Sequence, residues 1–143
     1  DHYGMPEAPR FAFHPLDNEL LEFPPSTVHL FGRNLPAAGG GYFRLMPYAL
    51  SRWLMRRVNH TDGQPCMFYF HPWEIDPDQP RIRSCFRSRF RHYHNLRKTR
   101  DKIGRLLSAF SFAPMSEVIG MAGGDSAENI VESASTISPR SIP

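Results

Sequence analysis

The most informative pattern in the sequence is an apolar, aromatic run over residues 66–71 that stops abruptly at polar side chains. A run of this length and composition predicts a buried strand. We expect the strand to end at His71, because Pro72 cannot donate a hydrogen bond to a sheet. An indole and two carboxylates follow: Trp73, Glu74 and Asp76. A strand that ends in such a cluster can hold reactive side chains in place at the edge of an α/β sheet.

Apolar residues spaced three and four apart predict two helices. The first covers residues 47–59, and Pro47 suits its first turn. Its apolar side is Met46, Leu50, Trp53, Leu54 and Val58. The second covers residues 95–110, with the apolar stripe Leu96, Ile103, Leu106, Leu107 and Phe110.

The remaining pattern predicts short strands and loops. Residues 19–23 and 27–31 are candidate strands, and Gly39, Gly40 and Gly41 predict a tight loop with close backbone approach. A helix, a short turn and an apolar strand in succession indicate an α/β protein with parallel strands. A parallel strand must be covered on both faces. The predicted elements are too few for that, so we expect the chain to be part of a larger α/β domain.

The two ends of the chain differ from its middle. Three prolines within residues 1–18 predict an irregular opening, and residues 112–115 are a candidate extended segment. From Ser116 onward small polar residues dominate, which predicts a disordered tail. The chain opens without Met, as expected of a processed product or a fragment of a longer protein.

The positive charge is concentrated in one stretch. The net charge is only +3, yet residues 81–102 hold nine Lys and Arg side chains against one acid, Asp101. Such a stretch can bind an anionic polymer, or it can be a solvated face that pairs with carboxylates elsewhere. Few aromatic residues are interleaved with these charges, so we expect no nucleic-acid partner.

Composition favours a globular protein of a reducing compartment. Hydrophobic residues make up 41% of the 143 residues, and no apolar run is long enough to span a bilayer. The first residues do not resemble a signal peptide, and Cys66 and Cys85 do not form a disulfide framework. These observations predict a cytoplasmic location without a membrane span.

His71 is the leading candidate for chemistry. At the end of a strand its imidazole can act as a general acid or base, and Glu74 or Asp76 can orient it or hold its proton. It can equally be a structural histidine bonded to a backbone carbonyl. Trp73 can stack on a sugar ring or cap the core, and its spacing does not decide between the two.

A metal site formed by this chain alone is not expected. His92 and His94 lie two residues apart on one face of what is predicted to be an extended segment, without a third ligand nearby. A nucleophile elbow, a phosphate loop and a paired Cys-x-x-Cys are also missing from the sequence.

Five blocks of the sequence, in order, resemble the C-terminal portion of a polysaccharide deacetylase. The nearest likeness is to the NodB-type enzymes of exopolysaccharide loci associated with exosortase and PEP-CTERM sorting. The blocks are residues 3–10, 21–27, 39–44, 70–81 and 88–93, and the resemblance extends from residue 1 to about residue 114. It implies that residues 1–114 are the C-terminal portion of the deacetylase domain. Residues 115–143 do not match, and their composition predicts a disordered tail.

The resemblance implies a fold and a reaction. The fold is α/β, the C-terminal part of a distorted (β/α) barrel that is incomplete in this chain. The reaction is metal-dependent hydrolysis of the N-acetyl amide of amino sugars in a polysaccharide, with zinc the usual divalent metal. His71 matches the histidine of the last family motif, a general acid that protonates the departing amine.

The same resemblance implies further roles. Phe70 would line the pocket for the acetyl methyl group, while Trp73, Tyr42 and Arg44 would help to bind the polysaccharide. The family's metal ligands and catalytic base precede the segment that this chain matches. We therefore expect the chain alone to bind no catalytic metal and to be inactive. A non-catalytic basic module that binds an anionic polymer and an inactive gene remnant remain alternatives.

Overall fold

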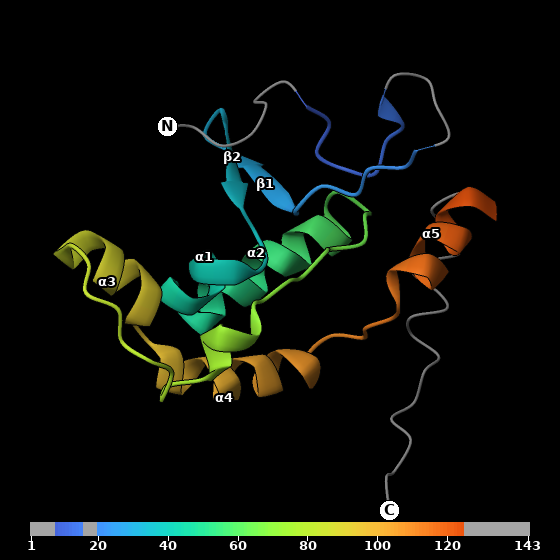
Figure 1. Cartoon of the computed structure of the whole chain (residues 1–143). Coiled ribbons are helices and arrows are strands. Elements are labelled where there is room, and N and C mark those ends of the chain that lie inside the picture. The colour runs from blue at the N-terminus through green and yellow to red at the C-terminus, as the bar shows by residue number, and fades with distance from the viewer. Residues whose placement is uncertain (1–7, 16–19, 125–143) are drawn as a thin grey trace, which may run out of the picture. The chain divides into compact units, whose positions relative to one another are not determined.

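The computed structural model describes residues 8–15 and 20–124, with side chains described as far as residue 120. Within this part the fold is a mixture of helices and one small sheet. The chain divides into two compact units, Asp1–Lys102 and Ile103–Pro143, which are described separately. The elements are β1 (Thr27–Leu30), β2 (Arg33–Pro36), α1 (Gly40–Leu45), α2 (Tyr48–His60), the 3-10 helix η2 (Pro72–Ile75), α3 (Phe86–Tyr93), α4 (Leu96–Leu107) and α5 (Met115–Gly124) (Figure 1).

The sheet is a hairpin, with β1 antiparallel to β2 and Val28 opposite Leu35. Phe31 and Gly32 form its turn, both with positive φ, as the tightest hairpin turns require. The prediction of a strand at residues 27–31 is confirmed. Parallel pairing was wrong for the described residues, and residues 20–23 contribute only an isolated bridge between Glu22 and Phe13. Antiparallel pairing forms here because a turn of two residues is enough to connect β1 and β2.

Helix α2 forms where the apolar spacing predicted it. Pro47 precedes the first residue of α2, and its carbonyl accepts a hydrogen bond from Ser51 N–H. Proline has no N–H, and at the start of a helix this costs no hydrogen bond within the helix. The buried side of α2 packs against β1, and Phe11, Leu30, Met46 and Cys66 lie around the centre of this core. The fully enclosed apolar residues of the centre are Val28, Ala37, Leu54 and Val58.

The apolar run at residues 66–71 is not a buried strand, which corrects the strongest expectation from the sequence. Residues 63–71 carry no regular secondary structure, and Tyr69 and Phe70 are 39% and 41% exposed. Isolated hydrogen bonds connect the run to the rest of the fold. Met67 N–H donates to Ser26 Oγ, and Gly40 N–H donates to the Tyr69 carbonyl. No described strand lies beside it to complete a ladder, so apolar composition alone does not make it a strand.

The glycines at residues 39–41 allow a close backbone approach, as predicted, but they also begin helix α1. Gly39 and Gly40 have φ values of 88° and 53°. A Cβ on Gly39 would lie 2.5 Å from Cδ1 of Tyr69, and one on Gly40 would lie 2.9 Å from its hydroxyl oxygen. Only glycine therefore lets the Tyr69 ring lie against the start of α1.

Replacing Gly39 with Ala should lower the free energy of unfolding by about 2–3 kcal/mol, because it adds both positive-φ strain and a clash with Tyr69. Gly63→Ala is the matched control. Gly63 also has positive φ, but nothing lies within 4 Å of its Cβ position, so its cost should be about 1 kcal/mol. Urea denaturation measures both variants, and equal losses would show that Tyr69 does not constrain Gly39.

The second predicted helix is confirmed as α4, whereas α3 was not predicted. The basic stretch before α4 contains Phe86 and Phe90 one helical turn apart, and their rings stack at 6.5 Å between centroids. Residues 81–91 are all exposed, so α3 carries its arginines on a solvated helix. His92 belongs to this helix, which corrects the extended segment expected around His92 and His94.

The second unit contains the end of α4 and helix α5. Helix α5 replaces the disorder expected from Ser116: Glu117 and Val118 donate backbone hydrogen bonds to the Pro114 carbonyl, so the proline starts the helix. The rest of the predicted tail, residues 125–143, lies outside the described residues, as does most of the predicted irregular opening. In the described part of the chain, every helix is too short or too polar to cross a bilayer.

Candidate functional site

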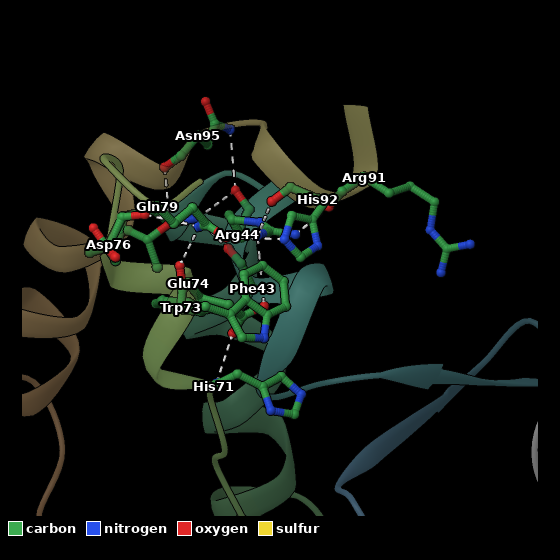
Figure 2. A network of polar contacts seen from close by, with 12 residues as sticks. Phe43, Arg44, His71, Trp73, Glu74, Asp76, Gln79, Arg91, His92 and Asn95 are labelled. Atoms are coloured by element: carbon green, nitrogen blue, oxygen red, sulfur yellow. Dashed lines mark hydrogen bonds and ion pairs between the residues drawn. The ribbon is translucent and has the colours of Figure 1, made fainter. Parts of the chain in front are cut away.

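The candidate site is built around His71, which stands at the N-terminal end of η2. Its backbone is extended, with φ −93° and ψ 142°, and Pro72 then fixes the first residue of the short helix. The Glu74 N–H donates to the His71 carbonyl at 2.9 Å, and the His71 N–H donates to Oε2 of Glu74 at 3.2 Å. The side chain of His71 is exposed. The backbone is thus tied down while the imidazole faces outward (Figure 2).

Trp73 lies between polar rings rather than in a core. Its indole is stacked on His92, with 4.2 Å between ring centroids and 13° between planes. It is also nearly parallel to the His71 ring, at 5.8 Å and 7°. The Arg44 guanidinium carbon lies 4.9 Å from the indole centroid, a cation–π distance. One indole therefore joins η2, α3 and α1.

Arg44 is inside the structure, and this changes its expected role. Arg44 is 1% exposed, and its guanidinium donates to the carbonyls of His92, at 2.8 Å, and Arg91. These carbonyls belong to the last turn of α3, whose carbonyls have no partner within the helix. Arg44 therefore ties α1 to the end of α3. This position favours a structural role over the sugar contact predicted from the resemblance.

Glu74 is the acid that faces Arg44. It is 1% exposed, and Oε1 lies 4.0 Å from an Arg44 terminal nitrogen. Burial lowers the pKa of the Arg44 guanidinium, and the Glu74 carboxylate acts in the opposite direction. Glu74 was expected to orient His71, and it does bond to the backbone of that residue. The contact is with the N–H and not with the ring.

Lys102 and Asn95 fasten α4 to the same place. Lys102 Nζ donates to the carbonyls of Phe43 and Met46, the latter at 2.7 Å, and Asn95 Nδ2 donates to the Arg44 carbonyl at 3.2 Å. Burial lowers the pKa of the Lys102 ammonium. The end of α1 thus receives the Lys102 ammonium from α4, a cation near a helix C-terminus, and the Asn95 amide from the residue just before α4.

The other predicted residues lie around this network. Tyr42 and Phe70 are 56% and 41% exposed, so both are available for contact with a ligand. Asp76 is exposed at the end of η2, where its carboxylate accepts the Asp78 N–H at 3.1 Å. Their predicted roles in binding and orienting stay predictions.

Sequence reasoning missed four residues of this network: Gln79, His92 in its stacking role, Asn95 and Lys102. Lys102 had a visible signal, because it continues the spacing of buried Leu96 and Thr99 along α4. Gln79 had none: in the turn after η2 its amide donates to the carbonyls of Trp73 and Asp76, contacts that depend on how the turn folds.

Cys66 lies beside this region and is a poor nucleophile. Burial raises the pKa of its thiol to about 11, partly opposed by a hydrogen bond with Ser26. At pH 8 only roughly one Cys66 in a thousand should be a thiolate, so alkylation by iodoacetamide should spare it while exposed Cys85 reacts. Mass spectrometry of the labelled chain tests this. Faster labelling of Cys66 than of Cys85 would contradict it.

The donor set does not fit a catalytic metal ion. Among the described residues, no three His, Cys, Asp or Glu side chains gather closely enough to bind one. The metal implied by the resemblance therefore has no ligand set among the described residues.

A family model for a domain of unknown function, DUF3473, matches residues 1–120. The chain belongs to the DUF3473 family. This domain is known from proteins associated with polysaccharide deacetylases. No curated protein and no solved structure matches the chain.

Membership of DUF3473 covers the whole network around His71, from Gly39 to Lys102, and continues into α5. The family boundary therefore includes a helix that the resemblance to deacetylases, which stops near residue 114, left out. The family model and the resemblance both cover residues 1–114.

Proposed function

We propose that this DUF3473 chain is part of a NodB-type polysaccharide N-deacetylase and supplies its general acid, His71. The observation that carries the proposal is the exposed imidazole on a fixed backbone: the segment before it is anchored at Gly40, and η2 follows it directly. A general acid must contact the substrate, and its position must be fixed by the surrounding structure. The occurrence of the domain with polysaccharide deacetylases supports the same reading.

The proposed chemistry is hydrolysis of the N-acetyl amide of an amino sugar. Water adds to the carbonyl carbon and gives a proton to a catalytic base in the remainder of the enzyme. The carbon–nitrogen bond then breaks, and the departing nitrogen takes a proton from the His71 imidazolium. Phe70, next to His71 and partly exposed, would contact the acetyl methyl group. Exposed Tyr42 on α1 would contact the sugar chain. In this proposal the chain forms the C-terminal part of a distorted (β/α) barrel, and the remainder of the enzyme supplies the divalent metal.

Acetate release tests the proposal. The protein to measure is the joined deacetylase, in which this domain is joined to a metal-binding deacetylase part. It should release acetate from an N-acetylated amino-sugar oligosaccharide. A chelator should abolish this activity, and zinc should restore it. The 143-residue chain alone should release none. Metal-dependent release by the chain alone, or no release by the joined protein under any metal, would overturn the proposal.

A second candidate function is binding of an anionic polymer by the basic surface of residues 81–102. The exposure of every residue from 81 to 91 favours it, and so does the pair of exposed rings, Phe86 and Phe90, among the arginines. A hollow along α4 adds Arg97 and Arg100 beside Asp78.

Salt separates the two functions. Binding of an acidic polysaccharide to this surface should weaken steeply when sodium chloride is raised from about 50 to about 200 mM, because salt screens contacts with a polyanion. The rate of hydrolysis of a neutral oligosaccharide should change little over the same range. Arg87→Gln/Arg91→Gln should weaken the binding, with Arg56→Gln on α2 as the control. Binding that ignores both salt and these substitutions would remove the second candidate.

A further inference from the structure

The rings of Tyr69, His71 and Trp73 form a row. Tyr69 and His71 alternate along the extended segment, which directs their side chains to one side, and Trp73 follows in η2. Tyr69 meets His71 edge to face, with 5.9 Å between centroids, and His71 lies nearly parallel to Trp73 at 5.8 Å. His71 is therefore flanked by two aromatic rings, and the position of each ring limits the rotation of the imidazole.

Both flanking rings are themselves fixed. Tyr69 lies against Gly39 and Gly40, where no Cβ would fit. Trp73 is stacked on His92, a contact shorter than the one between Trp73 and His71. From His71 through Trp73 to His92, the row therefore reaches the last turn of α3 (Figure 2).

His92 is held in turn by Gln79. Gln79 Nε2 donates to the carbonyls of Trp73, at 2.8 Å, and Asp76, at 2.9 Å. These two bonds fix which end of the amide is the NH₂ group, so its oxygen must be the atom 3.1 Å from His92 Nε2. An amide oxygen only accepts hydrogen bonds. His92 therefore carries a proton on Nε2.

We infer that His92 is a positioning residue: it fixes the indole of Trp73 and, through it, the imidazole of His71. This rests on the proposed function of His71. It also gives Trp73 a different role from the sugar platform expected from sequence, because a ring stacked at 4.2 Å and 13° covers one face of the indole. The C–H face of a sugar ring cannot stack on that face of the indole at the same time.

Nitrogen-15 correlation spectra of the histidine rings in the 143-residue chain test the structural part. Wild-type His92 should show a protonated Nε2. His92→Ala should shift and broaden the ring signals of His71, and His92→Phe, which keeps an aromatic ring on the indole, should leave them nearly unchanged. His60→Ala, at an exposed position at the end of α2, is the control. Unchanged His71 ring signals in His92→Ala would overturn the inference.

Turnover of the joined deacetylase tests the catalytic part. His92→Ala should lower kcat roughly 10-fold to 100-fold, as expected for a misplaced catalytic group, while KM stays within about twofold. His92→Phe should recover most of kcat. A kcat unchanged in His92→Ala would overturn the inference, as would an equal loss in His92→Phe.

Failure of this inference can be distinguished from failure of the proposed function. If His71→Ala leaves acetate release intact, His71 is not the acid and the catalytic role of His92 falls with it. If His71→Ala abolishes release and His92→Ala changes neither kcat nor the His71 ring signals, the proposed function stands and this inference is wrong.

Discussion

Replacing Arg44 with Met should lower the free energy of unfolding by about 3–5 kcal/mol, a large part of the stability of a domain of this size. The substitution leaves the Glu74 carboxylate buried without its cation. It also removes the donors to the Arg91 and His92 carbonyls and the contact with the Trp73 ring. Equilibrium denaturation in urea, followed by circular dichroism, measures the loss.

Two further variants assign the cause of this loss. Arg44→Met/Glu74→Gln should recover part of the stability, because it removes the buried charge that Arg44→Met leaves unpaired. Arg56→Met, at an exposed position on α2, should cost less than about 0.5 kcal/mol. A loss below about 1 kcal/mol for Arg44→Met would show that Arg44 does not hold α1, η2 and α3 together.

Replacing His71 with Ala in the joined deacetylase should lower turnover of an N-acetylated oligosaccharide roughly 10²-fold to 10⁴-fold, the range expected when a general acid is lost. Its bound metal and its unfolding midpoint should not change, since the ring is exposed and lies outside the buried network. Acetate release and metal analysis of the purified variant measure both. His60→Ala should retain full activity, and turnover within twofold of wild type for His71→Ala would remove His71 from the mechanism.

The sequence predicted helices better than it predicted the surroundings of the site. Helix α2 was found within one or two residues of its ends, because the spacing of its apolar side is a local property. Residues 66–71 were misread as a strand, because strand formation depends on a partner that apolar composition does not reveal. Helix α3 was missed because its charged residues hid the spacing of Phe86 and Phe90.

The sequence predicted that His71 and Glu74 belong to the site, but it did not predict which residues hold the site in place. His71 is exposed at the end of an extended segment, and Glu74 bonds to it. The sequence did not show that Arg44 would be internal, since a lone arginine after three glycines looks like a surface residue. Its contacts with α3 span 47 and 48 residues of sequence, and such distant pairings carry no local signal.

The role of His71 as an acid makes a sharper prediction than loss of activity. An amine must be protonated to leave, whereas an aryloxide leaves readily without a proton. We would therefore compare wild type and His71→Ala in the joined deacetylase on an N-acetylated oligosaccharide and on 4-nitrophenyl acetate. The account predicts a loss of roughly 100-fold or more on the amide and a much smaller loss on the ester. Equal losses on both substrates would contradict the proposal that His71 protonates the leaving group.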